Sequence, residues 1–223
     1  MEGQLAKSNL FSYNSPMKYQ AKPLPFLKPL KGISEKTMTI HHVKLYVGYV
    51  NKRNEIEEKL AVADRSLANA TYSEFGELKR EESFAANGIF LHEYYFNVLG
   101  GDGALGGENN QGGSLIEAIK TEFGSYNKWL EDFKATGMTA RGWVVLALDF
   151  NDGRLHNYLC DTHNHGGIWG ALPLVVLDMY EHAYFIDYGS DRKTYIEDYM
   201  QNLNWPAAQE IYQKVANMMP RKK

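Results

Sequence analysis

The strongest constraint on the fold of this chain is a glycine-rich segment, residues 100–113, in which half of the positions are glycine. Glycine destabilises the interior of helices and strands because it loses the most backbone freedom on ordering. A run this rich in glycine and asparagine therefore predicts a loop. We expect it to be a linker between two structural units, residues 33–99 before it and residues 114–223 after it.

The residues before the linker have the features of a helical hairpin. Residues 1–32 contain four prolines, which interrupt helices and sheet ladders alike, so we expect an extended N-terminal arm. Ser34 is a favourable N-cap, and the charge of Glu35 suits the first turn of a helix. The first helix is expected to run from there into the 60s. A second helix is expected over residues 83–98.

The residues after the linker have a mixed pattern. Two helices are expected near 114–122 and 125–136. The apolar stretch 143–150 then predicts a strand, and the sequence Asn-Asp-Gly that follows it predicts a hairpin turn. The expected remaining elements are a returning strand over 154–160, a short buried strand over 172–177 and helices to the end.

Composition excludes several classes of protein. The formal net charge is −3, so no broad basic surface indicates a nucleic-acid partner. No apolar run approaches the roughly 20 residues that span a bilayer, and the N-terminus lacks the pattern of a signal peptide. Cys160 is the only cysteine, which excludes an intrachain disulfide and a cysteine zinc cluster. We expect a cytoplasmic protein without a membrane anchor.

The histidines are the first candidates for chemistry. They are His41, His42, His92, His156, His163, His165 and His182. A single histidine on a helix is more often a surface or hydrogen-bonded core residue than a metal ligand. His92 and His182, however, lie in apolar and aromatic stretches that are expected to be buried. Burying a polar side chain is costly unless it finds a partner, and a metal ion is one such partner.

The spacing of these residues indicates a possible metal site. Asp178 and His182 are four positions apart, where a predicted strand ends. His41 and Tyr49 fall on one face of the first predicted helix, and His92 lies on the second. Three imidazoles and one carboxylate suit iron, manganese or zinc. Spacing alone leaves redox catalysis, zinc hydrolysis and a structural site open.

Three stretches of the sequence together resemble one enzyme family. The string DMYEHAY, which begins at Asp178, resembles the D-x-W-E-H-A-Y signature of iron/manganese superoxide dismutases, with Tyr180 in place of tryptophan. The stretch ISEKTMTIHHVKLYVGYVN resembles the first metal-binding helix of that family, and FAANGIFLHEYYFN resembles the second. The resemblance extends from Leu24 to Trp205. It implies an α+β fold, in which a helical hairpin domain precedes a domain with a three-stranded antiparallel sheet and helices.

The resemblance also implies a cofactor and a set of site residues. One iron or manganese ion per chain would convert superoxide to dioxygen and hydrogen peroxide by cycling between its three- and two-valent states. The implied residues are the metal ligands His41, His92, Asp178 and His182, the catalytic Tyr49, the pocket residue Trp143, and Lys44 and Arg192 at a positively charged substrate funnel.

Two positions bear on the choice of metal. Iron-type members of the family often carry a glutamine where this chain has Gly88, whereas manganese-type members have glycine there and send a glutamine from a later loop. In this chain that loop position, fifteen residues before Asp178, is His163. It matches family members in which a histidine contacts the metal-bound solvent. This variant occurs with either metal, so the resemblance leaves iron and manganese both open.

The resemblance implies a homodimer or tetramer. In the family, the glutamate at Glu181 bonds to the metal-ligating histidine of the other subunit, here the partner's His182. A histidine and a tyrosine that usually meet across the same interface are replaced by Leu45 and Phe185. The paired apolar change predicts that these two side chains pack together in the same dimer.

Two other readings of the sequence remain. A non-enzymatic metal-binding relative is supported only by the changes at Leu45 and Phe185. A mononuclear zinc hydrolase would need a general base near an open coordination position, for which Glu93 or Glu181 could serve.

Overall fold

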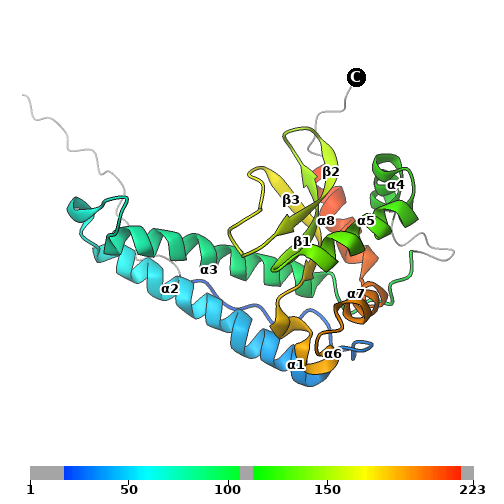
Figure 1. Cartoon of the computed structure of the whole chain (residues 1–223), viewed down its shortest axis with the longest axis horizontal. Coiled ribbons are helices and arrows are strands. Elements are labelled where there is room, and N and C mark those ends of the chain that lie inside the picture. The colour runs from blue at the N-terminus through cyan, green and yellow to red at the C-terminus, as the bar shows by residue number, and fades with distance from the viewer. Residues whose placement is uncertain (1–17, 106–112, 217–223) are drawn as a thin grey trace, which may run out of the picture.

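The computed structural model describes residues 18–105 and 113–216. Two long helices lie side by side as a hairpin, the sheet stands against one of them, and the remaining helices gather at one end of the molecule (Figure 1). The α+β fold expected from the sequence is confirmed. The hairpin part comprises α1 (Glu35–Thr39), the π-helical segment η1 (Ile40–Tyr46), α2 (Val47–Val62), η2 (Arg65–Leu67) and α3 (Glu74–Asn97).

The first predicted helix is present, but its conformation changes along its length. Ser34 caps it as expected, since its side-chain oxygen accepts a hydrogen bond of 3.1 Å from the backbone N–H of Thr37. The chain then runs without a break through α1, η1 and α2. The sequence did not predict the π-helical stretch. Short π-helical insertions are rare and frequently mark functional sites.

The second predicted helix begins earlier than expected, at Glu74 instead of residue 83. The side-chain oxygen of Ser73 accepts a hydrogen bond of 3.1 Å from the backbone N–H of Gly76, which caps the helix. Glu74 and Glu77 place negative charge in the first turn, where the helix dipole favours it. Phe75 and Leu78 are apolar at helical spacing and pack on a cluster with Ile56 and Leu60. The charged run 79–82 separates them from the apolar stretch on which the sequence-based boundary depended.

The second part carries the sheet. Its elements are α4 (Gly113–Phe123), α5 (Tyr126–Thr139), β1 (Trp143–Asp149), β2 (Arg154–Cys160), β3 (Ala171–Asp178), η3 (Glu181–Ala183), α6 (Phe185–Tyr188), α7 (Arg192–Gln201) and α8 (Trp205–Ala216). The strand order is β2-β1-β3, and both pairings are antiparallel. The register sets Trp143 opposite Asp178, so the end of β3 lies beside the start of β1.

One buried core runs through both parts of the molecule. It includes Tyr46 and Tyr95 from the hairpin together with Leu146 and Leu177 from the sheet. Helix α3 packs on β3, whereas α5 packs on β1 and β2. Helix α1 contacts η3, the segment that follows β3. The start of the first hairpin helix and the second hairpin helix thus both pack near the end of β3.

The two segments expected to be irregular are described only in part. Residues 18–34 contain no helix or strand, and the side chains of Tyr19 and Phe26 pack on the core. Residues 100–105 of the glycine-rich segment also lack helix and strand, and Gly113 begins α4. Residues 1–17 and 106–112 lie outside the described part. None of the helices in the described ranges combines the length and the hydropathy needed to cross a bilayer.

Candidate metal centre

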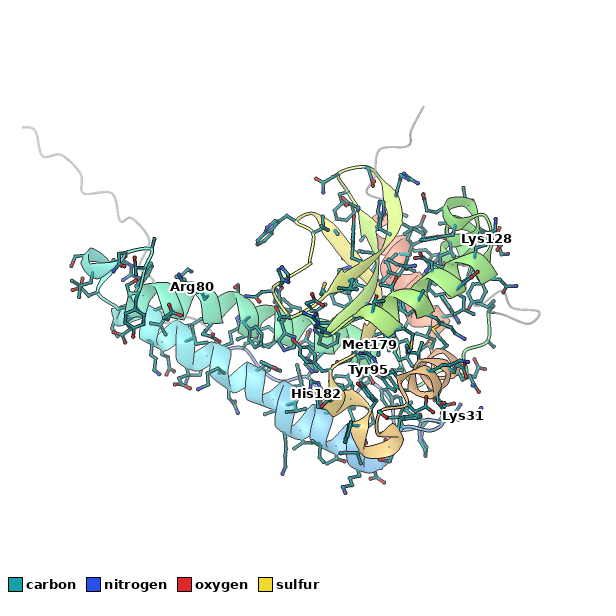
Figure 2. The ribbon with its side chains drawn as sticks, viewed as in Figure 1. Lys31, Arg80, Tyr95, Lys128, Met179 and His182 are labelled. Carbon is teal, nitrogen blue, oxygen red and sulfur yellow. The ribbon has the colours of Figure 1, made fainter. Side chains whose placement is uncertain are left out.

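Four side chains expected to bind metal meet at the base of the hairpin. His41 comes from η1, His92 from α3, Asp178 from the end of β3 and His182 from η3. One nitrogen or oxygen atom of each residue lies within 4.8 Å of those of the other three. Figure 2 labels His182 where the segment after β3 meets the hairpin. The fold thus brings all four predicted ligands to one point.

The distances within this cluster fit a single transition-metal ion. The Oδ2 atom of Asp178 lies 3.1 Å from His41 Nε2, 3.1 Å from His182 Nε2 and 3.7 Å from His92 Nε2. Ligand atoms about 2.1 Å from one ion are about 3–4 Å from each other. The side chains of His41, His92 and Asp178 are fully buried, and that of His182 is 24% exposed.

The protonation of His92 shows why a cation fits here. Its Nδ1 donates a hydrogen bond of 2.5 Å to the carbonyl oxygen of Gly88, so in the neutral ring Nε2 carries only a lone pair. That buried Nε2 has no hydrogen-bond partner among the residues that the structure describes, and it faces the Asp178 carboxylate. Two electron-rich atoms in a dry site repel each other unless a cation lies between them. The residues present therefore fit a metal ion.

The electrostatics of the cluster favour an ionised carboxylate at its centre. Burial opposes ionisation of Asp178, but His182 and His41 outweigh it and keep the pKa of this carboxyl well below its usual value. Burial lowers the pKa of both His41 and His92. Burial also disfavours the charged form of His182, yet the Asp178 charge raises the pKa of that histidine overall. One negative charge and three imidazoles suit a divalent or trivalent ion.

Beside the cluster, Trp143 fixes the tautomer of His163. The indole Nε1–H of Trp143 donates a hydrogen bond of 2.9 Å to His163 Nδ1. Burial lowers the pKa of His163 to about 4, so the ring is neutral near pH 7. Because an indole can only donate, the proton of the neutral ring must lie on Nε2. This buried Nε2–H has no partner in the described part of the chain, so it is available as a donor.

Gly88 has no side chain, and the rings of Tyr49 and His163 occupy the space beside it. A Cβ atom at this position would lie 3.0 Å from Cδ1 of Tyr49 and 3.2 Å from Cδ2 of His163. The rings of Tyr49 and His163 meet edge to face, with centroids 4.7 Å apart. The structure therefore brings the two predicted catalytic residues into contact beside Gly88. A larger side chain at this position would collide with both rings.

Comparison with known proteins identifies the family. The alpha-hairpin domain of iron/manganese superoxide dismutases matches residues 18–100, and the C-terminal domain of the same enzymes matches residues 111–211. The chain belongs to the iron/manganese superoxide dismutase family. It is 41% identical to "Superoxide dismutase [Fe]" of Aquifex aeolicus over 201 residues, covering 88% of this chain and 92% of the relative.

Relatives named for either metal are similar to this member of the family. "Superoxide dismutase [Fe]" of Cupriavidus metallidurans is 40% identical over 197 residues, covering 86% of this chain and 95% of the relative. "Superoxide dismutase [Mn] 1" of Halobacterium salinarum is 32% identical over 203 residues, covering 89% and 96%. The cofactor is therefore iron or manganese.

Sequence reasoning missed the place of some aromatic residues. Tyr180, noted only as a departure from the family signature, stacks on His182 with centroids 5.3 Å apart and lies 5.0 Å from the His163 ring. Phe96 packs 5.2 Å from the His41 ring. Its position four residues after His92, on the same helical face, could have indicated this contact.

The residues expected at the funnel and the interface have varied surroundings. Lys44, Glu181 and Phe185 are exposed in the single chain, and Leu45 is half-buried. Arg192 donates hydrogen bonds to backbone carbonyl oxygens of Gly137 and Ala140 at the end of α5. These contacts anchor α7 to α5, and a role of Arg192 at the funnel stays a prediction.

Proposed function

We propose that this chain dismutes superoxide with one iron or manganese ion bound by His41, His92, Asp178 and His182. The observation that carries the proposal is the buried His92 Nε2 lone pair, which faces the Asp178 carboxylate and receives no hydrogen bond within residues 18–105 and 113–216. When bound, the ion supplies a one-electron oxidation of one superoxide and a one-electron reduction of a second. Two superoxide ions and two protons give one dioxygen and one hydrogen peroxide.

Two side chains beside the ligands are assigned to proton donation. Burial, and secondarily the charge of Asp178, raises the pKa of Tyr49 to about 12, so its hydroxyl keeps its proton near neutral pH. His163 can donate only through Nε2, because Trp143 occupies Nδ1. Because the two rings are in contact, we assign both donors to the same small anion. Lys44, which is exposed on η1, is assigned to attract that anion.

We expect the purified chain to contain close to one iron or manganese ion and to dismute superoxide. Removing the metal with a chelator should abolish activity, and reloading with iron or manganese should restore it, because only these ions change valence here. Reloading with zinc should restore binding without turnover. Metal analysis together with a superoxide assay measures both.

The same experiment separates the alternative functions. Metal-loaded protein without turnover would indicate a non-enzymatic relative. A requirement for zinc would favour a hydrolase, and full activity in the metal-free protein would contradict the proposal outright.

The proposal includes a homodimer, located in the cytoplasm, in which Glu181 binds the partner's His182. In the single chain Glu181 is exposed beside His182. Phe185 is 53% exposed and Ile186 45% exposed, next to them in sequence. A two-fold interface would cover these apolar side chains on both subunits at once. The single cysteine, Cys160, is buried and unpaired, which suits a reducing compartment.

The interface predicts a specific response to restoring polar groups. Leu45→His alone is expected to weaken the dimer, because one buried polar group without a partner costs about 1–3 kcal/mol. Leu45→His together with Phe185→Tyr should recover most of that loss, since the two can bond to each other. Sedimentation equilibrium measures the dissociation constants. Met138→Gln, at an apolar side chain 47% exposed on α5, is the matched control. A monomeric unmodified chain would rule out this interface.

A further inference from the structure

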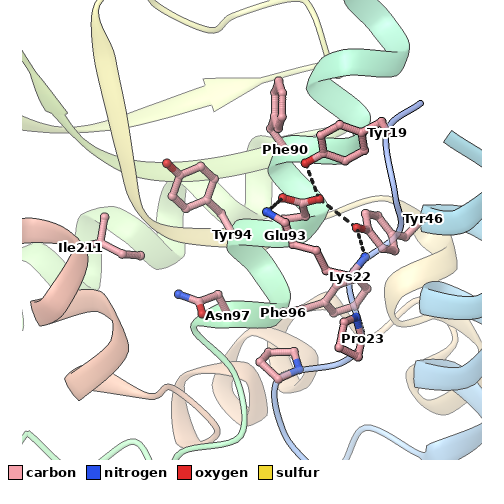
Figure 3. A pocket seen from close by; sticks show the side chains of 11 residues that line it. Tyr19, Lys22, Pro23, Tyr46, Phe90, Glu93, Tyr94, Phe96, Asn97 and Ile211 are labelled. Atoms are coloured by element: carbon pink, nitrogen blue, oxygen red, sulfur yellow. Dashed lines mark hydrogen bonds and ion pairs between the residues drawn. The ribbon is translucent and has the colours of Figure 1, made fainter. Parts of the chain in front are cut away.

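Behind the ligand cluster, one carboxylate joins three segments of the chain. Glu93 Oε1 accepts hydrogen bonds of 2.8 Å from the hydroxyls of both Tyr19 and Tyr46, and Glu93 Oε2 lies 2.5 Å from Lys22 Nζ (Figure 3). Its side chain is only 14% exposed. We call Tyr19, Lys22, Tyr46 and Glu93 the Glu93 network. It borders a cavity of about 380 Å³ between the N-terminal arm, α3 and α8.

The backbone of the arm is also bound to the π-helical segment. The N–H of Lys22 donates a hydrogen bond of 2.9 Å to the hydroxyl of Tyr46. Nε2 of His42 donates a hydrogen bond of 2.9 Å to the carbonyl oxygen of Lys22. Both main-chain polar groups of one arm residue are therefore satisfied by two residues of η1. The arm is therefore bound to the first turn of η1 at His42 and to its last residue, Tyr46.

The conformation of η1 matters because it carries a predicted metal ligand. His41 lies in the π-helical segment, and Tyr46 ends it. A π-helical stretch is intrinsically less favourable than an α-helix and persists where tertiary contacts support it. If the segment relaxed to an α-helix, the shift of one residue would rotate His41 by about 100° relative to Tyr49. His41 and Tyr49 could then no longer face the same site.

The Glu93 network is placed to prevent that relaxation. Glu93 directly follows His92 on α3, and Tyr46 on η1 donates to it. The two helical segments that carry His41 and His92 are thus joined through one partly buried carboxylate, which also binds Lys22 of the arm. We propose that Glu93 is a positioning residue, which through Tyr46 and Lys22 locks the π-helical segment in the register that sets His41 against Asp178. This inference rests on the proposed function, since it concerns the metal-bound state.

Tyr46→Phe tests the inference, because it removes the central hydroxyl and keeps the ring in the core. Release of bound iron or manganese to a chelator is expected to accelerate by about 10-fold, as for other residues that orient metal ligands. The gain in Tm on metal binding should shrink, and the electron paramagnetic resonance spectrum of the bound ion should change. A merely structural residue would lower the Tm of metal-free and metal-loaded protein equally.

Tyr158→Phe is the matched control. Tyr158 likewise donates from its hydroxyl to a carboxylate, Asp149, at 2.5 Å, but both residues lie on the sheet. This variant should lower both Tm values and leave the metal release rate and the spectrum unchanged. Accelerated release in Tyr158→Phe to the same extent as in Tyr46→Phe would overturn the inference.

Lys22→Met provides a second variant that is safe for folding, because the Lys22 side chain is 64% exposed. It should accelerate metal release to a smaller extent than Tyr46→Phe. Wild-type release rates in these variants would overturn the positioning role and leave the proposed function intact. An unmodified chain that retains neither iron nor manganese would instead refute the proposed function, and the inference with it.

Discussion

Asp178→Ala is expected to abolish metal binding and superoxide dismutation together. Asp178 supplies the only carboxylate of the cluster, and its Oδ2 is the atom around which the three histidine Nε2 atoms converge. Without it, three imidazoles, two of them fully buried, would face a cation with no compensating negative charge. Affinity should fall by more than the roughly 100-fold typical of residues that only orient ligands. His92→Ala should have the same result, and metal analysis with a superoxide assay measures both.

A second group of possible ligands provides the control for this prediction. Asp149, Asp152 and His156 also bring one ligand atom each within 4.8 Å, at the β1–β2 hairpin. Asp149 already accepts hydrogen bonds from Tyr158 and Asn151, so its oxygen atoms are used within the protein. Asp149→Ala should therefore keep the metal and the activity. If Asp149→Ala lost the metal and Asp178→Ala retained it, the ion would bind at the β1–β2 hairpin. That result would contradict the assignment of Asp178 as a metal ligand.

The sequence could predict most of the fold because its signals were local. The Asn-Asp-Gly turn fixes the β1–β2 hairpin, and Gly153 has the positive φ of 72° that such a turn requires. Ser34 likewise caps the first helix as expected. The start of α3 lies earlier than expected, because the charged run 79–82 interrupts the apolar pattern between Leu78 and Phe84.

The sequence could predict which residues belong to the candidate site, but it could not predict how they are arranged in space. The spacing of Asp178 and His182 indicated that a carboxylate and an imidazole could meet, but their meeting with His41 depends on packing between distant segments. The π-helical segment had no sequence signal, because its support comes from residues as far away as Lys22 and Glu93. The tautomer of His163 likewise depends on Trp143, which lies on another element. Long-range contacts of this kind are invisible to periodicity and propensity.

Gly88→Ala is expected to retain the metal and lose most of the activity. The added Cβ would lie 3.0 Å from Tyr49 Cδ1 and 3.2 Å from His163 Cδ2, so one of the two rings must move. Overpacking of this kind costs about 1–3 kcal/mol of stability. Displacement of a proton donor by a fraction of an ångström to an ångström should slow turnover by up to about 100-fold. Steady-state kinetics on variant protein of known metal content measure the effect.

The same contact predicts how Gly88 and His163 depend on each other. His163→Ala alone should keep the metal and slow turnover, because the Nε2–H donor is lost. Gly88→Gln alone should be more harmful than Gly88→Ala, since the longer side chain needs the space that His163 fills. In the variant that combines Gly88→Gln with His163→Ala, the space of the His163 ring is free and the glutamine amide can replace the lost donor. The activity of this double variant should therefore exceed that of Gly88→Gln alone. Residues in contact couple in this way, whereas independent sites add. Strict additivity of the two changes would show that Gly88 and His163 do not share the pocket beside Tyr49.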